Sequence, residues 1–223
     1  MFDVSKIRAD FPILAREVYG KPLVYLDNAA SAQKPKAVVD AMLTSMTAEY
    51  ANVHRGLHFL SNAATQAFED ARESVRRFLN APSKDQIIFT RNATEAINLV
   101  AQSFGGMMIG EGDEIVLSIL EHHSNIVPWH FHRERRGAVI KWSPIDDDGN
   151  FLIEEFARLL GPRTRMVAVT MMSNALGTVT PIADIIRLAH AKGIPVLVDA
   201  SQGAVHGAVD VQTLDADFVV FTG

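Results

Sequence analysis

Asp199 and Gln202 follow an apolar run, Ile194 to Val198, whose composition predicts a buried strand. In open α/β sheets, ligands collect beyond the carboxyl ends of the strands. A carboxylate at such an end can pair with the protonated ring nitrogen of an aromatic cofactor. The pattern therefore favours a cofactor cleft beyond this strand, with Asp199 as the partner of the ring.

A second candidate lies where a predicted strand, Gln86 to Thr90, leads into a helix that starts near Asn92. Free backbone N–H groups and the positive end of the helix dipole make a helix start an anion site, and the Thr94 hydroxyl can add a donor to a phosphate. The alternative is that Asn92 and Glu95 form only a pair resembling a capping box. On these residues alone, both interpretations stay open.

The segment Glu121 to Asn125 follows a predicted strand that ends near Ser118, so its side chains also fall at a carboxyl edge. The imidazole of His122 could stack on an aromatic ring. A metal held by His122 and His123 would need further ligands that the sequence does not supply, because adjacent histidines in extended backbone point to opposite sides. A histidine that only caps a helix is the third interpretation.

Two more polar positions could reach a ligand. Asn174 follows the predicted strand Met166 to Thr170, and its amide could donate to a phenolate oxygen or simply bond its own turn. Arg55 lies in a polar segment between two predicted helices, where its guanidinium could take a carboxylate or a phosphate with two parallel donors. Solvation at the surface is the competing explanation for Arg55.

The elements that must position these side chains alternate between short β-branched runs and longer helical patterns, which indicates an α/β fold with a mostly parallel sheet and helices on both faces. The predicted strands are Gln86 to Thr90, Glu114 to Ser118, Ala138 to Trp142, Met166 to Thr170, Pro195 to Asp199 and Asp217 to Phe221. The predicted helices are Pro35 to Glu49, Asn62 to Leu79, Asn125 to Arg135, Phe151 to Leu160 and Ile182 to Lys192. Because parallel strands end at one edge, a single cleft can collect all the candidates just named.

Composition narrows the function classes. The 223 residues carry a net charge of −5 and no clusters of Lys and Arg, which argues against nucleic acid or an anionic membrane as the main partner. No apolar run approaches the roughly 20 residues of a membrane span, and we expect a cytoplasmic protein. Zero cysteines exclude disulfides and thiolate metal sites in this stretch. We therefore expect a protein that acts on a small molecule, and we expect no metal site.

Five motifs together resemble a known family. They are Tyr25-Leu26-Asp27-Asn28-Ala29-Ala30, Ala51-Asn52-Val53-His54-Arg55-Gly56, Arg91-Asn92-Ala93-Thr94-Glu95-Ala96-Ile97-Asn98, Glu121-His122-His123-Ser124-Asn125-Ile126-Val127-Pro128-Trp129 and Ser173-Asn174-Ala175-Leu176-Gly177-Thr178. The chain resembles the cysteine desulfurases, and more narrowly the SUF-type (group II) branch of the class V aminotransferases among fold-type I pyridoxal phosphate enzymes. The resemblance covers nearly all of the sequence in the correct order.

The resemblance implies pyridoxal 5'-phosphate as the cofactor and gives each candidate a role. His122 and Asp199 are the expected catalytic residues, the first stacked on the ring and the second paired with its nitrogen. The expected cofactor-binding set is Ala93, Thr94, His122, Asn174, Asp199, Gln202 and Thr222, where Thr222 stands at a position that is usually serine in the family. On the substrate side the resemblance implies Ala29, His54 and Arg55.

The activity implied is removal of sulfur from L-cysteine, which gives L-alanine and an enzyme persulfide for iron-sulfur cluster assembly. In the family pattern, the lysine that binds the cofactor and the catalytic cysteine both lie beyond Gly223, so we expect the activity of the full-length protein and not of this stretch alone. We expect an N-terminal fragment, with residues 1–20 packing with the small domain and 21–223 forming an incomplete cofactor-binding large domain.

The alternatives are a selenocysteine lyase acting on L-selenocysteine, and a non-catalytic paralogue that serves as a binding scaffold. A scaffold has no reason to keep Asp199, Gln202, His122 and Thr94 together, which speaks against it. The partners implied by the family are a second identical subunit in a homodimer and a sulfur-acceptor protein.

Overall fold

The computed structural model describes residues 3–222. The chain divides into two compact units, Met1–Ser74 and Val75–Gly223, and each is described by itself. This division follows the contacts between residues. The expected domain boundary near residue 20 stays a prediction.

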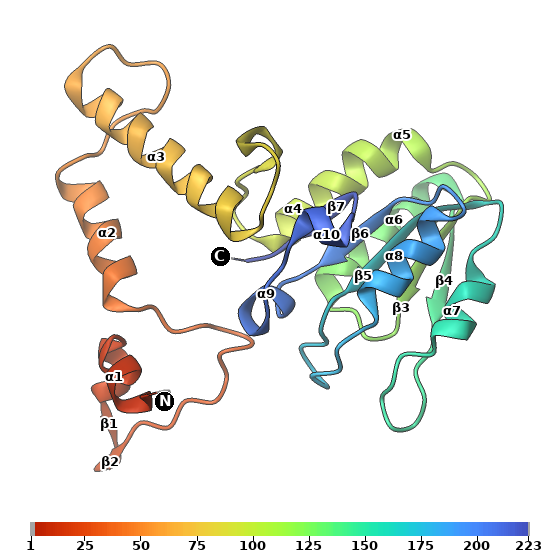
Figure 1. Cartoon of the computed structure of the whole chain (residues 1–223), viewed down its shortest axis with the longest axis horizontal. Coiled ribbons are helices and arrows are strands. Elements are labelled where there is room, and N and C mark those ends of the chain that lie inside the picture. The colour runs from red at the N-terminus through yellow and green to blue at the C-terminus, as the bar shows by residue number, and fades with distance from the viewer. Residues whose placement is uncertain (1–2, 223) are drawn as a thin grey trace. The chain divides into compact units, whose positions relative to one another are not determined.

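The first unit begins with a short helix, α1 (Val4–Ala9), whose N-terminus is capped by Asp3 through a bond from Lys6 N to Asp3 Oδ1 (3.1 Å). A 3-10 turn and a two-stranded antiparallel ribbon follow, and then the helices α2 and α3 (Figure 1). Their bounds are η1 (Pro12–Ala15), β1 (Glu17–Val18), β2 (Lys21–Pro22), α2 (Lys36–Thr47) and α3 (Phe59–Phe78). Among the described side chains of residues 3–74, only Ser61 is buried.

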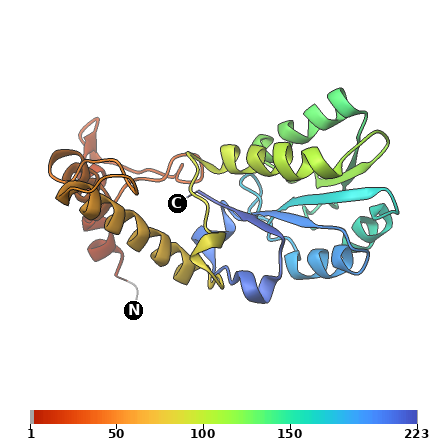
Figure 2. The same ribbon diagram turned by 90° about the horizontal axis from the view of Figure 1, so that it is seen from above.

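The second unit is built on a parallel sheet of five strands in the order β4-β3-β5-β6-β7. The strands are β3 (Glu114–Ser118), β4 (Val139–Ser143), β5 (Thr164–Thr170), β6 (Val196–Asp199) and β7 (Phe218–Val220). Helices cover both faces, as Figure 2 shows with the sheet seen edge-on between two helical layers. The predicted α/β fold and five of the six predicted strands are therefore confirmed, with ends shifted by at most two residues.

Alternating side chains of the strands make two separate cores, because successive residues of a strand point to opposite faces. One core joins Val116, Val167, Val169, Val196 and Val198 to helices α7 (Ile153–Leu159) and α8 (Ile182–His190). The other joins Ile115, Leu117, Met166, Ala168 and Leu197 to α4 (Ala93–Val100) and α6 (Val127–Arg136). The strands are apolar on both sides because both sides are covered.

The predicted strand at Gln86 to Thr90 is wrong. Lys84–Gln86 forms a 3-10 turn, η2, capped by Ser83, and residues 87–90 pair with no strand among residues 3–222. Ile87 is buried in the core below, whereas the side chain of Ile88 is 69% exposed. The apolar composition therefore reflects one anchoring residue, and β propensity cannot form a strand where no neighbour offers a ladder.

The remaining helical segments are short. The predicted helix after Asn92 continues from α4 into a π turn, η3 (Ala101–Gly105), and ends in α5 (Gly106–Met108). A 3-10 turn, η4 (His123–Asn125), precedes α6, and α9 (Gly203–His206) and α10 (Val211–Leu214) connect β6 to β7. Among the described residues, none of these helices has the length and hydropathy needed to span a bilayer.

Candidate functional site

The candidate site lies at the edge where four of the five strands of the sheet end. The strands β3, β5, β6 and β7 finish at Ser118, Thr170, Asp199 and Val220, and in register Asp199 pairs with Thr170 on one side and Val220 on the other. The segments that leave this edge carry His122, Asn174, Gln202 and Thr222 in turn. Parallel strands thus bring together positions that lie up to 100 residues apart in the sequence.

Asp199 is a buried carboxylate, with 3% of its surface exposed. Its Oδ1 accepts from Ser201 N at 3.0 Å, and its backbone oxygen accepts from Met171 N at 2.8 Å. None of the ion pairs among residues 3–222 supplies Asp199 with a basic side chain. A buried carboxylate costs free energy unless a cation or several donors compensate it, so Asp199 is suited to a positively charged ligand group.

The first turn of α4 lies beside this edge, since α4 packs against both η4 and β7. Asn92 Oδ1 accepts from Glu95 N at 2.9 Å, and the Glu95 carboxylate is hydrogen-bonded to Arg91, which lowers the pKa of Glu95. The capping pair expected as the alternative is thus present. The Asn92 side chain binds the amide of Glu95, the third residue of the helix. Helix geometry leaves the amides of Ala93 and Thr94 without intrahelical acceptors.

Ala93 and Thr94, the first two residues of α4, differ in burial. The Ala93 side chain is buried in the core, so only its backbone faces outward. Thr94 is exposed and lines a shallow groove of about 530 Å³ together with Arg91, Asn92, Glu95, Asn98, Leu99 and Gln102. The Arg91 guanidinium neutralises Glu95 over 2.9 Å, which reduces the repulsion that a bound anion would meet. Capping and anion binding are therefore compatible here.

His122 is exposed between two buried residues, Glu121 and Asn125. Its Nδ1 accepts from Ser124 N at 3.2 Å and lies 2.8 Å from Ser124 Oγ. The rings of His122 and His123 are nearly perpendicular, at 85° and 6.2 Å between centroids. His122 therefore caps η4 and still presents its ring at the surface, which joins two of the interpretations that the sequence left open.

Glu121 is a residue that sequence reasoning missed. Its carboxylate is buried and accepts from three donors, the Ser118 hydroxyl, Thr170 N (2.9 Å) and Asn125 Nδ2 (2.8 Å). Burial raises the pKa of Glu121 to about 7, and the charge of Asp199 also raises it. The available signal was an acid three residues after the end of an apolar strand and four residues before an asparagine.

Asn174, Gln202 and Thr222 occupy the other segments of the edge. Ser173 organises the turn after β5, because its Oγ accepts from Ala175 N (3.3 Å) and Leu176 N (3.2 Å). The side chain of Asn174 is exposed, and the hydrogen bonds to the turn amides come from Ser173 and not from Asn174. Gln202 is half-buried at the start of α9, and Thr222 is exposed two residues after β7.

The proposed substrate residues Ala29, His54 and Arg55 are exposed and belong to the first unit. His54 adopts a positive φ of 66°, its N donates to Thr65 Oγ1 at 2.9 Å, and its Nε2 lies 3.6 Å from Glu69 Oε1. Their roles remain predictions.

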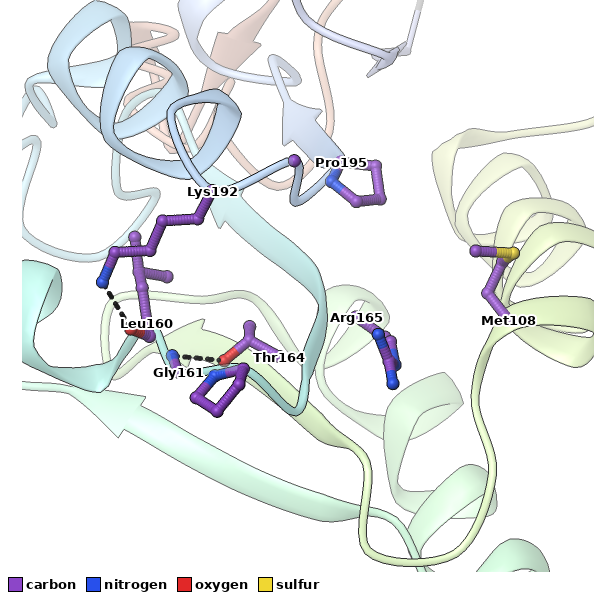
Figure 3. Close-up of a pocket in the computed structure, with 9 residues that line it drawn as sticks. Met108, Leu160, Gly161, Thr164, Arg165, Lys192 and Pro195 are labelled. Atoms are coloured by element: carbon purple, nitrogen blue, oxygen red, sulfur yellow. Dashed lines mark hydrogen bonds between the residues drawn. The ribbon is translucent and has the colours of Figure 1, made fainter.

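A pocket of about 360 Å³ lies at the opposite edge, where β5 and β6 begin (Figure 3). Its two cations are already engaged, since Lys192 Nζ donates to Leu160 O at 2.5 Å and Arg165 Nε lies 2.9 Å from Asp113 Oδ1. Ligands of parallel sheets bind at the carboxyl ends of strands, so the other edge is the better candidate.

Comparison with known proteins agrees with this assignment of the fold. Residues 24–223 match the family described as aminotransferase class-V. A cysteine desulfurase of Enterobacter sp. (strain 638) is 52% identical over 222 residues, which cover 100% of this chain and 55% of the relative. The names of such relatives do not favour the selenocysteine lyase or the scaffold.

Solved structures give the same picture. The cysteine desulfurase CsdA of Escherichia coli, in its S-sulfonic acid form, has a TM-score of 0.86 at 40% identity and covers 99% of this chain and 54% of its own. The apo cysteine desulfurase of Thermococcus onnurineus NA1 has a TM-score of 0.91 at 35% identity, with coverages of 99% and 53%. The chain spans between 33% and 55% of the length of the curated relatives that it matches.

Proposed function

This chain belongs to the class-V aminotransferase family, and from that premise we propose that the whole protein is a pyridoxal phosphate-dependent cysteine desulfurase. It would remove sulfur from L-cysteine and release L-alanine. The support is the sequence identity of about 50% to relatives that are named cysteine desulfurases, together with the chemistry of the candidate site. The activity concerns the whole protein, because the chain spans only part of its relatives.

The observation that carries the proposal is the buried Asp199 without a basic side-chain partner among residues 3–222. A protonated pyridine nitrogen is a cation of the right kind, since a carboxylate keeps it protonated. When bound, pyridoxal phosphate supplies an electron sink for charge that develops at the substrate Cα. Asp199 would stabilise that sink, and its own burial strengthens the attraction because water is excluded.

The other residues would hold and orient the cofactor. The amide of Ala93 and the hydroxyl of Thr94 would donate to the phosphate at the start of α4, with Thr222 as a further donor. His122 would stack on the ring, and Asn174 and Gln202 would donate to its phenolate oxygen. The phosphate, the ring and the phenolate oxygen of the cofactor would thus each have a side chain or amide suited to bind it.

On the substrate side, Ala29, His54 and Arg55 would contact the substrate, and the Arg55 guanidinium can bind an anionic group with two parallel donors. The arginine that holds the substrate carboxylate in the family is not among these residues. The thiolate that accepts sulfur must come from outside this sequence, which has no cysteine. We also propose a homodimer and a sulfur-acceptor protein of iron-sulfur cluster assembly, on the resemblance alone.

The test uses the whole protein and two matched asparagine variants. Asp199→Asn should lose most visible absorbance of bound pyridoxal phosphate and lower alanine release by at least about 100-fold, because the neutral amide no longer holds the pyridinium proton. Asp217→Asn, at the opposite end of a strand and 38% exposed in its side chain, is the control and should keep the activity. Wild-type protein that releases no alanine from L-cysteine in the presence of the cofactor and a thiol would refute the proposal.

A further inference from the structure

A line of buried polar side chains runs under the segment that carries His122. Trp129 Nε1 donates to Asn125 Oδ1 at 3.2 Å, and Asn125 Nδ2 donates to Glu121 Oε2 at 2.8 Å. Ser118 Oγ and Thr170 N donate to the other oxygen of Glu121. Every hydrogen bond in this line therefore points toward Glu121, whose carboxylate form accepts all of them.

The direction of the line is fixed by its far end. An indole N–H is a donor and never an acceptor, so Trp129 must face the oxygen of the Asn125 amide. The amino group of Asn125 then has to face Glu121, which must offer an acceptor there. A glutamine at position 121 could not satisfy all its neighbours, because its own amino group would meet another donor.

The same bonds tie the His122 segment to the sheet. The bond between Asn125 and Glu121 closes the segment 122–124 at its base, and Asn125 N also donates to His122 O at 2.8 Å. Glu121 in turn holds the ends of β3 and β5 through Ser118 and Thr170. An exposed histidine is thus carried on a short turn whose two flanking residues are buried and bonded to each other.

A purely structural role would be served better by another residue type. Glu114, the buried acid at the other end of β3, has Lys141 Nζ at 2.7 Å and is compensated by charge. Among the described residues, Glu121 has donors but no basic side chain within ion-pair distance. A buried charge held by neutral donors is costly, and a fully hydrogen-bonded polar network fixes the geometry of the groups that it joins.

We propose that Glu121 is a positioning residue, whose carboxylate holds the His122 turn against the ends of β3 and β5 so that the imidazole can stack on the bound cofactor. This inference deepens the proposed function and rests on it. Glu121 acts through His122 and does not touch the reacting atoms. The position of the turn depends on a donor facing each acceptor along the line. It does not depend on whether position 121 or position 125 carries the negative charge.

The test exchanges the acid and the amide in the whole protein. Glu121→Gln and Asn125→Asp should each place two donors or two acceptors opposite each other in the line. In cofactor-free protein, each variant should raise the rate of hydrogen exchange of the backbone amides of residues 122–126. In the holoenzyme, each should lower kcat about tenfold with a smaller change in KM. The double variant E121Q/N125D restores a donor opposite every acceptor. It should recover slow exchange and most of the lost kcat.

Two controls separate the outcomes. Glu114→Gln also neutralises a buried glutamate of the same sheet, and it should leave exchange in residues 122–126 unchanged. In His122→Ala, adding Glu121→Gln should lower kcat no further, because Glu121 acts through the missing ring.

The proposal is overturned if E121Q exchanges like the wild type, or if E114Q disturbs residues 122–126 equally. Should E121Q fail to fold, the double variant decides, since recovery supports the pattern and failure to recover contradicts it. If wild-type protein binds no pyridoxal phosphate, the proposed function fails, and the exchange data still report whether Glu121 holds the turn.

Discussion

The indole nitrogen of Trp129 donates to Asn125 Oδ1 over 3.2 Å, and this single contact sets the orientation of the Asn125 amide. Trp129 is fully buried on α6, where it also fills the core beneath α4. The aromatic residue of the core and the polar residue of the site are therefore bonded to each other. The side chain of Trp129 therefore contributes both to the packing of the core and to the hydrogen bonds at this edge.

Trp129→Phe should destabilise the protein by about 1–3 kcal/mol, because it removes a hydrogen bond to a buried acceptor and leaves a small void. Urea denaturation followed by circular dichroism measures the change. Trp142→Phe is the matched control, since Trp142 is 38% exposed and the sequence has only these two tryptophans. Equal losses in both variants would contradict the role given to the indole nitrogen.

Glu121 should make stability depend on pH. Burial, with the nearby charge of Asp199, raises its pKa from the ordinary 4.5 to about 7, so the folded protein holds a proton that the unfolded chain has released. This contribution is complete below pH 4.5 and is lost as the pH rises to about 7. The free energy of unfolding of E121Q minus that of the wild type should therefore rise across this window, by up to about 1.4 kcal/mol per pH unit.

Urea titrations at several pH values give this difference directly. Asp199 is the charged group that raises the pKa of Glu121, so Asp199→Asn should move the window to lower pH. A difference between E121Q and wild type that stays flat from pH 4.5 to 7 would show that Glu121 ionises normally.

Lys141→Met should cost about 2–4 kcal/mol, because it leaves the buried carboxylate of Glu114 without its nearest cation. Burial raises the pKa of Glu114, but the bonds from Lys141 and Thr164 and the charge of Arg163 outweigh it, so that the pKa lies below the ordinary value. Arg163→Met is the comparison, with a 66% exposed side chain 3.6 Å from Glu114. It should cost less than about 0.5 kcal/mol in the same unfolding measurement.

Thr94→Val should weaken binding of pyridoxal phosphate by about fivefold, the worth of one hydrogen bond, and leave binding of pyridoxal unchanged. The reason is that valine keeps the shape and lacks the donor to the phosphate. Fluorescence titration of the whole apoprotein with both compounds measures the two affinities. Thr213→Val, exposed on α10, should change neither affinity. Equal weakening for both compounds would remove Thr94 from the phosphate site.

Gly203→Ala should destabilise the protein by about 1–3 kcal/mol, because an added Cβ would lie 2.5 Å from Met171 Sδ and 3.0 Å from Met171 Cβ. A second substitution, Met171→Ala, should relieve the clash, so the two changes together cost less than their sum. Gly207→Ala, whose Cβ would meet its nearest atom at 3.8 Å, is the tolerated control. Thermal unfolding of the four variants tests this non-additivity.

The strands of the sheet were predictable because they are apolar on both faces, and Glu114 to Ser118 matches β3 residue for residue. The run from Gln86 to Thr90 has the same local character and forms no strand, since pairing needs a neighbour that a local pattern cannot reveal. The positions of the candidate residues His122, Asn174 and Asp199 at one edge follow from the rule that parallel strands end together. Glu121 does not follow from that rule, because its donors come from residues as distant as Thr170.

The sequence by itself determined the class of fold, the edge at which the polar residues gather and the family motifs, since each depends on local pattern and order along the chain. Only the tertiary structure decided which of those polar groups are buried and bonded to one another. Thr170 and Glu121 are 49 residues apart, yet one donates to the other at 2.9 Å. Burial and hydrogen-bond direction arise from the approach of distant segments, and these set the charge and the position of each side chain at the candidate site.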